Sequence, residues 1–334
     1  MNIKSVRQTA REKLKGFCRV CPECNGKACV GEVPGMGGAG TGASFRNNVE
    51  ALSALRINMR TLHGAKNPNT RIELFGQNLT APILAAPIAG NKFNMGGALN
   101  EVEWAEAILQ GCLSEGVLGC TGDGPDPMMY NTGIEAIVKA QGCGIPFTKP
   151  REPEEAIRYL KRAEEANALA VGIDIDAAGL IAMAVGPKTI EELKTIISST
   201  TLPVILKGIM TADEAELAIQ AGAAAIVVSN HGGRVLDHTP GTAEVLPRIA
   251  VAVDGRIPVL VDGGIRSGID VLKMLALGAD AVLIGRPLVI AAYGGGTEGV
   301  ALVVRRMKNE LKQAMLMTGC ATLSDIDKDI LYQK

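Results

Sequence analysis

The chain has 334 residues, of which 47% are hydrophobic and 3% aromatic, and its 34 basic side chains balance 35 acidic ones for a net charge of −1. This balance excludes a global field that attracts nucleic acid or a membrane surface, and the scarcity of rings argues against a base-stacking platform. A globular protein that acts on small molecules is therefore the default interpretation.

The first twenty residues form a basic amphipathic segment, with Lys4, Arg7, Arg11, Lys13 and Lys15 but no continuous apolar stretch. Neither this segment nor a later one has the apolar length of a secretory signal or a membrane span, so we expect a cytoplasmic protein without a membrane partner. In a reducing compartment its eight cysteines are thiols or metal ligands rather than disulfides.

Four cysteines crowd together next in the chain, at Cys18, Cys21, Cys24 and Cys29. Such close spacing suits thiolate ligation of zinc or of an iron–sulfur cluster, because short turns can aim the sulfurs at one point. The spacing fits no single metal signature tightly, so reduced thiols without a ligand are the alternative. An iron–sulfur cluster would indicate electron delivery to a redox partner, whereas zinc would only hold the segment together.

The stretch Gly35–Gly40 formally fits the pattern G-x-G-x-x-G, but it does not follow a strand within a βαβ unit. We therefore interpret it as a flexible covering loop and not as a dinucleotide site. A helix is expected over 44–60. Because residues 1–80 lack the repeating pattern of the rest of the chain, we interpret them as an extension that covers one end of the following domain.

From about residue 81 the chain repeats a short apolar run, a polar or glycine-containing turn and a helical pattern. The apolar runs predict strands at 82–87, 117–120, 144–147, 168–173, 203–206, 224–228, 257–261 and 280–284. The helical patterns predict helices at 101–111, 133–140, 153–166, 189–198, 211–221, 242–253, 267–277 and 297–317. Eight such repeats are the number that closes a parallel (β/α)8 barrel, here over residues 81–334. An open doubly wound sheet is the alternative, but it would have fewer strands and a switch point.

Polar and charged side chains follow the last four predicted strands, where barrel enzymes build their active sites. They occur in the runs Lys207-Gly208, Ser229-Asn230-His231-Gly232-Gly233-Arg234, Asp262-Gly263-Gly264-Ile265-Arg266 and Gly285-Arg286. Since the carboxyl ends of the strands meet at one rim, we expect these runs to converge on one site.

The last two of these runs predict a phosphate site. Glycine lets backbone amides approach an anion, the helix after Ser267 directs its amino end the same way, and Arg266 and Arg286 add forked donors. The alternative is that both arginines pair with surface carboxylates, which their position after strand ends disfavours.

The same part of the chain carries a resemblance to a known family, through the runs Leu206-Lys207-Gly208-Ile209, 228–234, 262–268 and Ile284-Gly285-Arg286. These runs resemble those of the FMN-dependent 2-hydroxy-acid dehydrogenases and oxidases, the family of glycolate and lactate oxidases. The likeness extends, with lower fidelity, from the first strand to the C-terminus. It implies an FMN-binding barrel that oxidises a 2-hydroxy acid or a related carboxylated alcohol.

The resemblance implies how the flavin is held. Lys207 would lie beside flavin N1 and O2 and stabilise negative charge on the reduced ring, and Ser229 would touch the same edge. Asp262 would hold the ribityl hydroxyls or orient the neighbouring loop. The remaining implied flavin contacts are the phosphate ligands Gly264, Arg266, Gly285 and Arg286 and the ring-lining backbone of Pro87, Ile88 and Ala89.

The resemblance also implies a catalytic set. His231 would accept the substrate proton as a hydride equivalent passes to flavin N5, and Arg234 would bind the substrate carboxylate in a bidentate manner. Asp174, after the fourth strand, would pair with the histidine, orient it and raise its pKa. Asp123 is interpreted as a turn-former outside this set.

The chain departs from the family pattern where the substrate would be held. Members usually place one tyrosine in the N-terminal segment and another after the third strand, but no tyrosine precedes residue 130, and the third strand ends in Phe147-Thr148-Lys149. The loop from Ala177 to Pro187 also lacks the second substrate arginine of the family. The carboxylate would then be bound by Arg234 alone or with the help of Lys149.

Two other functions remain open beside the FMN-dependent oxidoreductase. One is an isomerase of the type 2 isopentenyl diphosphate isomerase kind, and the other is a flavin-binding protein without this catalysis that meets a partner through its cysteine segment. The run from His231 to Arg234 argues against the isomerase, which does not need that base and carboxylate clamp together. The resemblance also implies a homo-oligomer of tetramer size or larger and leaves oxygen, a quinone or a protein as the electron acceptor.

Overall fold

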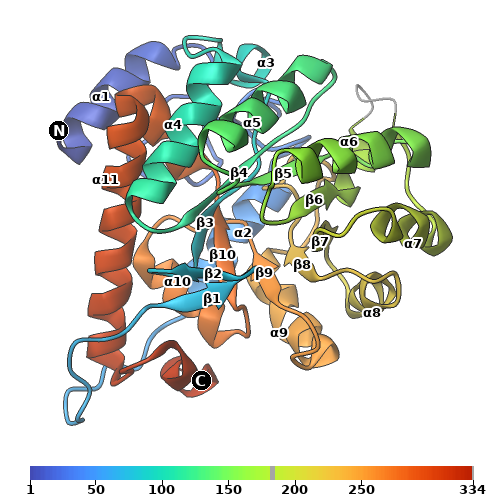
Figure 1. Ribbon diagram of the computed structural model, residues 1–334. Coiled ribbons are helices and arrows are strands. Elements are labelled where there is room, and N and C mark those ends of the chain that lie inside the picture. The colour runs from blue at the N-terminus through green and yellow to red at the C-terminus, as the bar shows by residue number, and fades with distance from the viewer. Residues whose placement is uncertain (181–184, 333–334) are drawn as a thin grey trace.

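Eight parallel strands close into a barrel in the computed structural model, which describes residues 1–180 and 185–332 (Figure 1). In order around the barrel, β10 is followed by β3 to β9. The strands are β3 (Ile83–Ala85), β4 (Leu118–Thr121), β5 (Ile145–Thr148), β6 (Val171–Asp174), β7 (Val204–Ile209), β8 (Ala225–Val228), β9 (Val259–Val261) and β10 (Ala281–Ile284). Each overlaps a predicted strand, so the predicted (β/α)8 barrel is confirmed.

A layer of helices surrounds the barrel. Its members are α4 (Glu101–Ser114), α5 (Pro127–Lys139), α6 (Pro153–Glu165), α7 (Ile190–Ser198), α8 (Ala212–Gln220), α9 (Thr242–Val253), α10 (Gly268–Ala276) and α11 (Arg286–Thr318). The residues at the amino ends of several of these helices explain where the helices begin. Helix α6 begins with Pro153, whose missing N–H would be unpaired there, and Thr189 and Glu192 form a reciprocal capping box before α7.

The barrel interior is filled with side chains and is not a channel. Its inward-facing positions hold Leu84, Leu118, Cys120, Ile145, Phe147, Ile205, Val227, Leu260 and Leu283, each at most 2% exposed. Successive side chains alternate between the two faces of a strand, so the other strand positions pack against the helices. The Phe147 ring occupies the space beside Gly172, where an added Cβ would lie 2.1 Å from it.

Helix α11 is longer than the predicted helix at 297–317, because a shorter helix after β10 joins it across a kink at Gly295 and Gly296. By length and composition α11 is apolar enough to cross a membrane, although 61% of its apolar window is buried inside the protein. It packs against α10, α4 and α1 (Ile3–Lys13). Its apolar character is therefore explained by packing within the fold.

The remaining part of the extension contains α2 (Ala43–Ala54) and a hairpin of β1 (Ile72–Leu74) and β2 (Gln77–Leu79). The predicted helix at 44–60 ends early because the chain after α2 pairs with the C-terminal segment. Ile57 forms an isolated bridge with Leu331, and the Asn58 N–H donates to the Ile330 carbonyl at 2.8 Å. That segment holds the short 3-10 helices η3 (Leu323–Asp325) and η4 (Lys328–Ile330).

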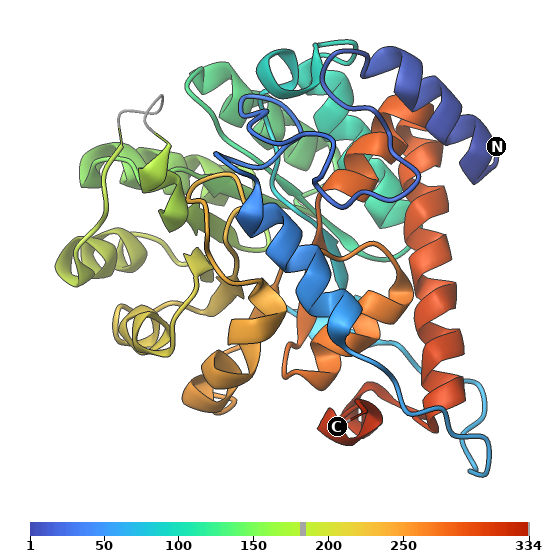
Figure 2. The same cartoon turned by 180° about the vertical axis from the view of Figure 1, so that it is seen from behind.

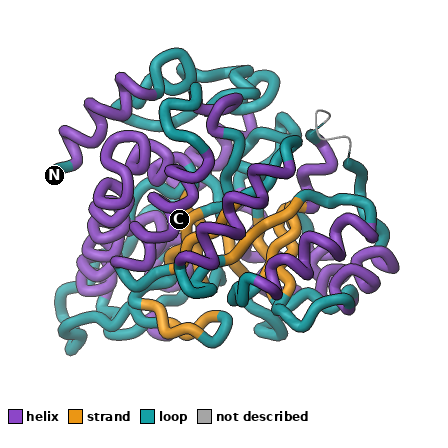
Figure 3. The backbone as a smooth tube through the Cα atoms, turned by 45° about the horizontal axis from the view of Figure 1, so that its top comes forward, coloured by secondary structure: helices purple, strands orange, loops and turns teal. Residues whose placement is uncertain are grey.

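The extension covers both ends of the barrel and not one end as expected. Helix α2 lies over the loops that follow β8 and β9, since an added Cβ at Gly233 would lie 2.3 Å from the Phe45 nitrogen (Figure 2). At the opposite end, Leu74 and Leu79 of the hairpin join the cluster of side chains inside the barrel. Figure 3 shows this hairpin as a separate pair of strands beside the barrel.

Candidate active site

A large cavity lies at the carboxyl ends of the barrel strands, with about 1170 Å³ of space between the protein atoms and at its open mouth. Its volume and position are typical of a small-molecule site in this architecture. The predicted site residues that line it are Pro87, Ile88, Ala89, Lys207, His231, Arg234, Asp262, Gly264, Arg266, Gly285 and Arg286. Asp174 and Ser229 are fully buried beside these residues. The strand-end runs therefore converge as the sequence predicts.

The floor of this cavity continues the inward-facing positions of the strands. Directly after β3 and β10, and two residues beyond the inward-facing Leu84 and Leu283, the chain has the small residues Ala86 and Gly285. At the equivalent points β5, β7 and β9 present Lys149, Lys207 and Asp262. One side of the floor is thus uncharged and lined by small residues, which leaves room for a ring, and the other side is an arc of charged groups.

Lys207 is at the centre of this arc. Its ammonium lies 2.8 Å from Asp174 Oδ1, 3.9 Å from Asp262 Oδ2 and 4.0 Å from Asp176 Oδ2. Burial by itself lowers the pKa of Lys207, but the three carboxylates outweigh it and raise that pKa above its usual value. Lys207 is therefore a permanent positive charge beneath the cavity.

Asp174 lies between two ammonium groups, because its Oδ2 also lies 2.7 Å from Lys149 Nζ. Burial alone would raise the pKa of Asp174, but Lys149 and Lys207 lower it well below its usual value. Asp174 therefore pairs with these lysines and is not the hydrogen-bond partner of His231. The sequence-based assignment of that role to Asp174 was wrong.

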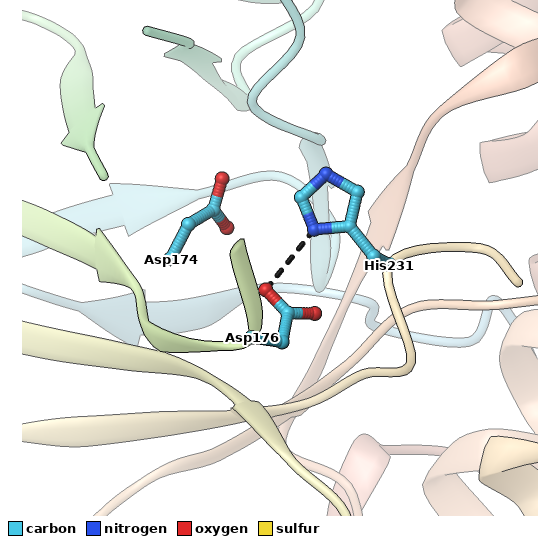
Figure 4. Close-up of side chains that lie close together, drawn as sticks. All are labelled: Asp174, Asp176 and His231. Carbon is cyan, nitrogen blue, oxygen red and sulfur yellow. Dashed lines mark hydrogen bonds and ion pairs between the residues drawn. The ribbon is translucent and has the colours of Figure 1, made fainter. Parts of the chain in front are cut away.

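The partner of His231 is Asp176, whose Oδ1 lies 3.0 Å from the ring Nδ1 (Figure 4). A carboxylate can only accept, so Nδ1 carries the proton and Nε2 is left as the basic nitrogen. The backbone N–H of His231 donates to Ser229 Oγ at 3.0 Å, which fixes the start of this loop. Contact between Ser229 and a flavin stays a prediction.

Asp176 comes from the short helix η1 (Ile175–Gly179), which turns the chain back over the mouth after β6. Gly208 makes room for it, since an added Cβ there would lie 2.5 Å from Asp176 Cβ. The run Asp174-Ile175-Asp176 contains a signal for this role, because residues two apart share a face in an extended chain. The choice between the two carboxylates depends on η1, which the sequence pattern does not indicate.

The pKa of His231 lies below its usual value and not above it as expected. Burial is the main cause, and the neighbouring Lys207 charge adds to it. Asp176 raises the pKa but offsets only part of this shift. His231 is therefore neutral near neutral pH, which is the form that accepts a proton.

Three arginines line the cavity without a carboxylate partner among the described residues: Arg234, Arg266 and Arg286. Their partners are neutral oxygens, such as Asn94 Oδ1 for Arg234 at 2.9 Å, the Cys24 carbonyl for Arg266 at 3.1 Å and the Met36 carbonyl for Arg286 at 2.8 Å. Burial lowers the pKa of Arg234 to about 10 and that of Arg286 to about 9, so both are charged at neutral pH. The site thus offers positive charge to anionic ligands.

The covering loop at residues 35–40 is held against these arginines. Arg234 donates to the Gly35 carbonyl. Arg286 donates to the Met36 carbonyl and to the Gly37 carbonyl, at 2.8 Å in each case. The Ala39 N–H also donates to the Gly233 carbonyl at 2.8 Å. The loop therefore covers the mouth as expected, but hydrogen bonds fix its path.

The residues present fit FMN. Arg266 has a buried guanidinium nitrogen, and Asp262 a buried carboxylate oxygen, without a hydrogen-bond partner in the described part of the chain. Gly263 and Gly264 have positive φ and lie against Asn48, so only a residue without a side chain fits there. Arginine donors, a free acceptor and close glycine backbone are what a phosphate and a ribityl chain require.

One predicted phosphate donor is absent from this arrangement. The Arg266 and Ser267 amides both donate to Asp270 Oδ2, at 2.9 and 3.1 Å. The Gly268 amide donates to Glu310 Oε2 at 2.9 Å. Because carboxylates already take these N–H groups, the amino end of α10 does not contribute as the sequence suggested.

Asp123 does more than form a turn. It is buried, pairs with Arg151 at 2.9 Å and accepts from the Lys149 amide at 3.1 Å. Both Asp123 and Lys149 line the cavity. The Asp123–Arg151 pair therefore fixes the segment that delivers Lys149 to Asp174.

Among the described residues, Asp174, Asp176 and His231 are the group of metal-ligating side chains whose ligand atoms all lie within 4.8 Å of one another. Lys207 Nζ lies 3.4 Å from His231 Nδ1 and 2.8 Å from Asp174. An ammonium therefore already lies against these acids, which argues against a metal ion at this position.

The four N-terminal cysteines converge on a second, smaller hollow. Its lining includes Cys18, Cys21, Cys24, Cys29, Gly26, Ala28, Met36, Arg286 and Ile290. All four are free thiols of intermediate exposure. Met36 and Arg286 also line the large cavity, so the two sites share a wall.

Comparison with known proteins places this geometry in a family. The family model described as FMN-dependent dehydrogenase matches residues 35–184 and 180–333. The chain is 34% identical over 322 residues to a 2-hydroxyacid oxidase of Dictyostelium discoideum, covering 87% of this chain and 83% of that protein. It is 34% identical over 325 residues to an L-lactate oxidase of Lactobacillus jensenii, covering 85% and 76%. Among solved structures it is similar to mandelate oxidase with (S)-2-phenylpropionate, with a TM-score of 0.81 and 30% identity over 100% of this chain and 98% of that one.

Proposed function

The chain belongs to the FMN-dependent dehydrogenase family, and from this premise we propose that it oxidises a 2-hydroxy acid with His231 as the base and Arg234 as the carboxylate ligand. FMN-dependent oxidation of 2-hydroxy acids is the chemistry of its relatives. The observation that carries the residue assignment is the partly buried His231–Asp176 pair, which shares the cavity with an Arg234 guanidinium that has no carboxylate partner in the described part of the chain.

FMN, when bound, supplies the acceptor for the hydride equivalent that leaves the substrate carbon. Arg266, Arg286 and the Gly263–Gly264 backbone would hold its phosphate, and Asp262 would accept from a ribityl hydroxyl. Lys207 supplies a positive charge that three carboxylates maintain against the opposing effect of burial. A fixed positive charge at the ring edge favours the electron-rich reduced state.

His231 and Asp176 move the substrate proton. Nε2 of the neutral imidazole takes the proton, and Asp176 stabilises the resulting imidazolium through Nδ1–H. The lowered pKa keeps the base unprotonated at neutral pH before the reaction. Lys207 at 3.4 Å from Nδ1 opposes protonation of the ring, so Asp176 is needed to offset it.

Arg234 gives the substrate its orientation. Its guanidinium lines the cavity near His231, carries its charge at neutral pH and has Asn94 and the Gly35 carbonyl as neutral partners. A carboxylate that replaces neutral partners forms charge-assisted hydrogen bonds, each worth roughly 1.5–3 kcal/mol. This contact would place the neighbouring hydroxyl within reach of the imidazole.

The test is anaerobic reduction of the bound flavin by a panel of 2-hydroxy acids, followed by absorbance. His231→Gln should keep FMN bound and lower the reduction rate by about 10²–10⁴-fold, the usual contribution of a general base. His238→Gln is the matched control, because His238 lies in an exposed loop with a side chain that is 73% exposed. Reduction of the His231→Gln protein at the wild-type rate would contradict the assignment.

We also propose that Cys18, Cys21, Cys24 and Cys29 hold zinc or an iron–sulfur cluster. Their convergence on one hollow supports this proposal, because unligated surface thiols have no reason to gather there. Elemental analysis of protein purified without chelators tests it. Metal-free protein with four freely reacting N-terminal thiols would contradict it.

A further inference from the structure

The cysteine segment belongs to this chain and not to the matched part of the family, since the family match begins at residue 35. The segment nevertheless has a defined path. Arg7 of α1 donates to the Cys21 carbonyl at 2.5 Å, and Arg11 donates to the Val20 carbonyl at 3.1 Å. Val20 itself is fully buried. The fold therefore presents the thiols from a supported loop.

The separation of the sulfurs distinguishes between the possible ligands. A single zinc ion bonds sulfur at about 2.3 Å in a tetrahedron, which brings the sulfurs to about 3.8 Å from one another. Among the described residues, no three of these cysteines have sulfurs all within 4.8 Å of one another. They surround a hollow instead. A cubane cluster, with iron atoms at separate corners, fits such a wider frame.

The spacing supports the same ligand. Cys18, Cys21 and Cys24 repeat the C-x₂-C-x₂-C run that supplies three ligands to one iron–sulfur cluster in bacterial ferredoxins. The fourth ligand in those proteins comes from outside the run, and here Cys29 lines the same hollow and would take that place. The Val20 N–H donates to Cys18 Sγ at 3.4 Å. Backbone donors to ligand sulfurs are a feature of such clusters because they stabilise the negative charge.

Arg286 links this hollow to the flavin cavity, since it lines both. Its guanidinium lies 3.7 Å from the centre of the Phe45 ring and donates to carbonyls, with no carboxylate partner in residues 1–180 and 185–332. A buried cation without an anion is costly. Four thiolates around iron form an anion on one side of Arg286, and the FMN phosphate forms one on the other.

We propose that Cys18, Cys21, Cys24 and Cys29 hold a [4Fe–4S] cluster that shares Arg286 with the phosphate end of the flavin site. The cluster would carry electrons out of the reduced flavin, and this role rests on the proposed oxidation of a hydroxy acid. The substrate gives up an electron pair and protons, the cluster takes the electrons from the flavin one at a time, and a one-electron acceptor protein removes each. The protons pass to water.

The test begins with protein purified anaerobically or reconstituted with iron and sulfide. We expect iron and acid-labile sulfide in equal amounts, about four of each per chain, and a paramagnetic signal after reduction with dithionite. Cys24→Ser should lose both. Cys143→Ser is the matched control, because Cys143 is a free cysteine of similar exposure outside the cluster, and it should retain them.

A second measurement uses the shared wall. Arg266 binds the Cys24 carbonyl, so loss of the cluster should displace this arginine and raise the Kd for FMN by about tenfold, the equivalent of one charge-assisted hydrogen bond. At saturating FMN, transfer of electrons to a one-electron dye should slow in Cys24→Ser. Flavin reduction by the hydroxy acid is measured separately on the wild-type protein, so a failure of the oxidation proposal is distinguished from a failure of the cluster proposal.

Three outcomes would overturn the cluster. They are one zinc per chain with no sulfide, a disulfide among the four cysteines, and iron content that is the same in Cys24→Ser as in Cys143→Ser. If Cys24→Ser does not fold, the iron and sulfide content of the wild-type protein decides the question. An unchanged Kd for FMN in a folded, cluster-free variant would overturn the coupling between the cluster and the phosphate end of the flavin site.

Discussion

Asp174 and Asp176 show how far single residues could be assigned from the sequence. The position after β6 correctly indicated a carboxylate near His231, because strand ends meet at the barrel mouth. The two residues differ in function because Lys149 and Lys207 bind the first, and η1 turns the second toward the imidazole. Neither the ion pairs nor the turn has a signal in residue spacing.

At this scale, Asp176→Asn tests the histidine pair. Asp176 raises the pKa of His231, so its removal lowers that pKa further below the usual value. Activity requires the neutral base and is lost as pH falls through this pKa. The acid limb of kcat/KM should therefore move to lower pH by about one unit or more, and kcat should fall roughly tenfold per unit because the imidazolium loses its partner. A pH–rate profile with an unchanged acid limb would exclude the pairing.

Lys149→Met tests the ion pair with Asp174. Asp174 then keeps Lys207 as its partner, so we expect a loss of about 1–3 kcal/mol in the free energy of unfolding. Flavin reduction should slow, because Lys207 would be fully neutralised by Asp174. Urea denaturation and stopped-flow absorbance measure the two effects. Lys139→Met, which breaks the exposed pair with Glu106, is the control and should change neither.

At the scale of elements, the strands were predictable because alternating apolar runs and helical patterns repeat with little ambiguity. The boundaries of helices were less predictable from the sequence where distant contacts determine them. The helix at α2 ends at Ala54 because the following backbone pairs with residues near Leu331. That contact lies outside any local window of sequence. Helix α11 differs for a local reason, because a shorter helix that starts at Arg286 joins the predicted one across a kink at Gly295 and Gly296.

Gly294→Ala tests the packing of α1 on α11. Alanine favours a helix by about 1 kcal/mol over glycine, so propensity alone predicts a more stable protein. An added Cβ would lie 2.1 Å from the Val6 carbonyl oxygen, however, and α1 must move. We expect a net loss of about 1–3 kcal/mol, seen as a lower Tm. Gly64→Ala is the control, since nothing lies within 4 Å of its added Cβ.

At the scale of the whole molecule, the count of βα repeats was sufficient to predict the barrel and the convergence of its last four loops. The role of the extension was not predictable in the same way. Residues 1–80 reach the barrel mouth through contacts with parts of the chain some 190 to 250 residues away, such as Thr41 with Asp237 and Met36 with Arg286. Composition and spacing do not encode such pairings.

FMN should stabilise the whole apoprotein, because the ligand binds only the folded state. At 100 times its Kd the gain in free energy of unfolding is about 2.7 kcal/mol. Riboflavin, which has no phosphate, is the matched control and should give a much smaller rise in Tm, since Arg266 and Arg286 would have no anion to bind. Equal shifts with both ligands would contradict the phosphate assignment.

The wall built from Met36 and Arg286 also has a consequence for biosynthesis. These residues stand 250 positions apart, so the first is released from the ribosome long before the second exists. The cysteine segment and covering loop therefore lack their contacts with Arg286 until that residue has been synthesised. A growing chain has no complete vitamin-binding pocket, and a product cut short before β10 has none at all. Loading of the prosthetic group can therefore be completed only after β10 and the start of α11 have been synthesised.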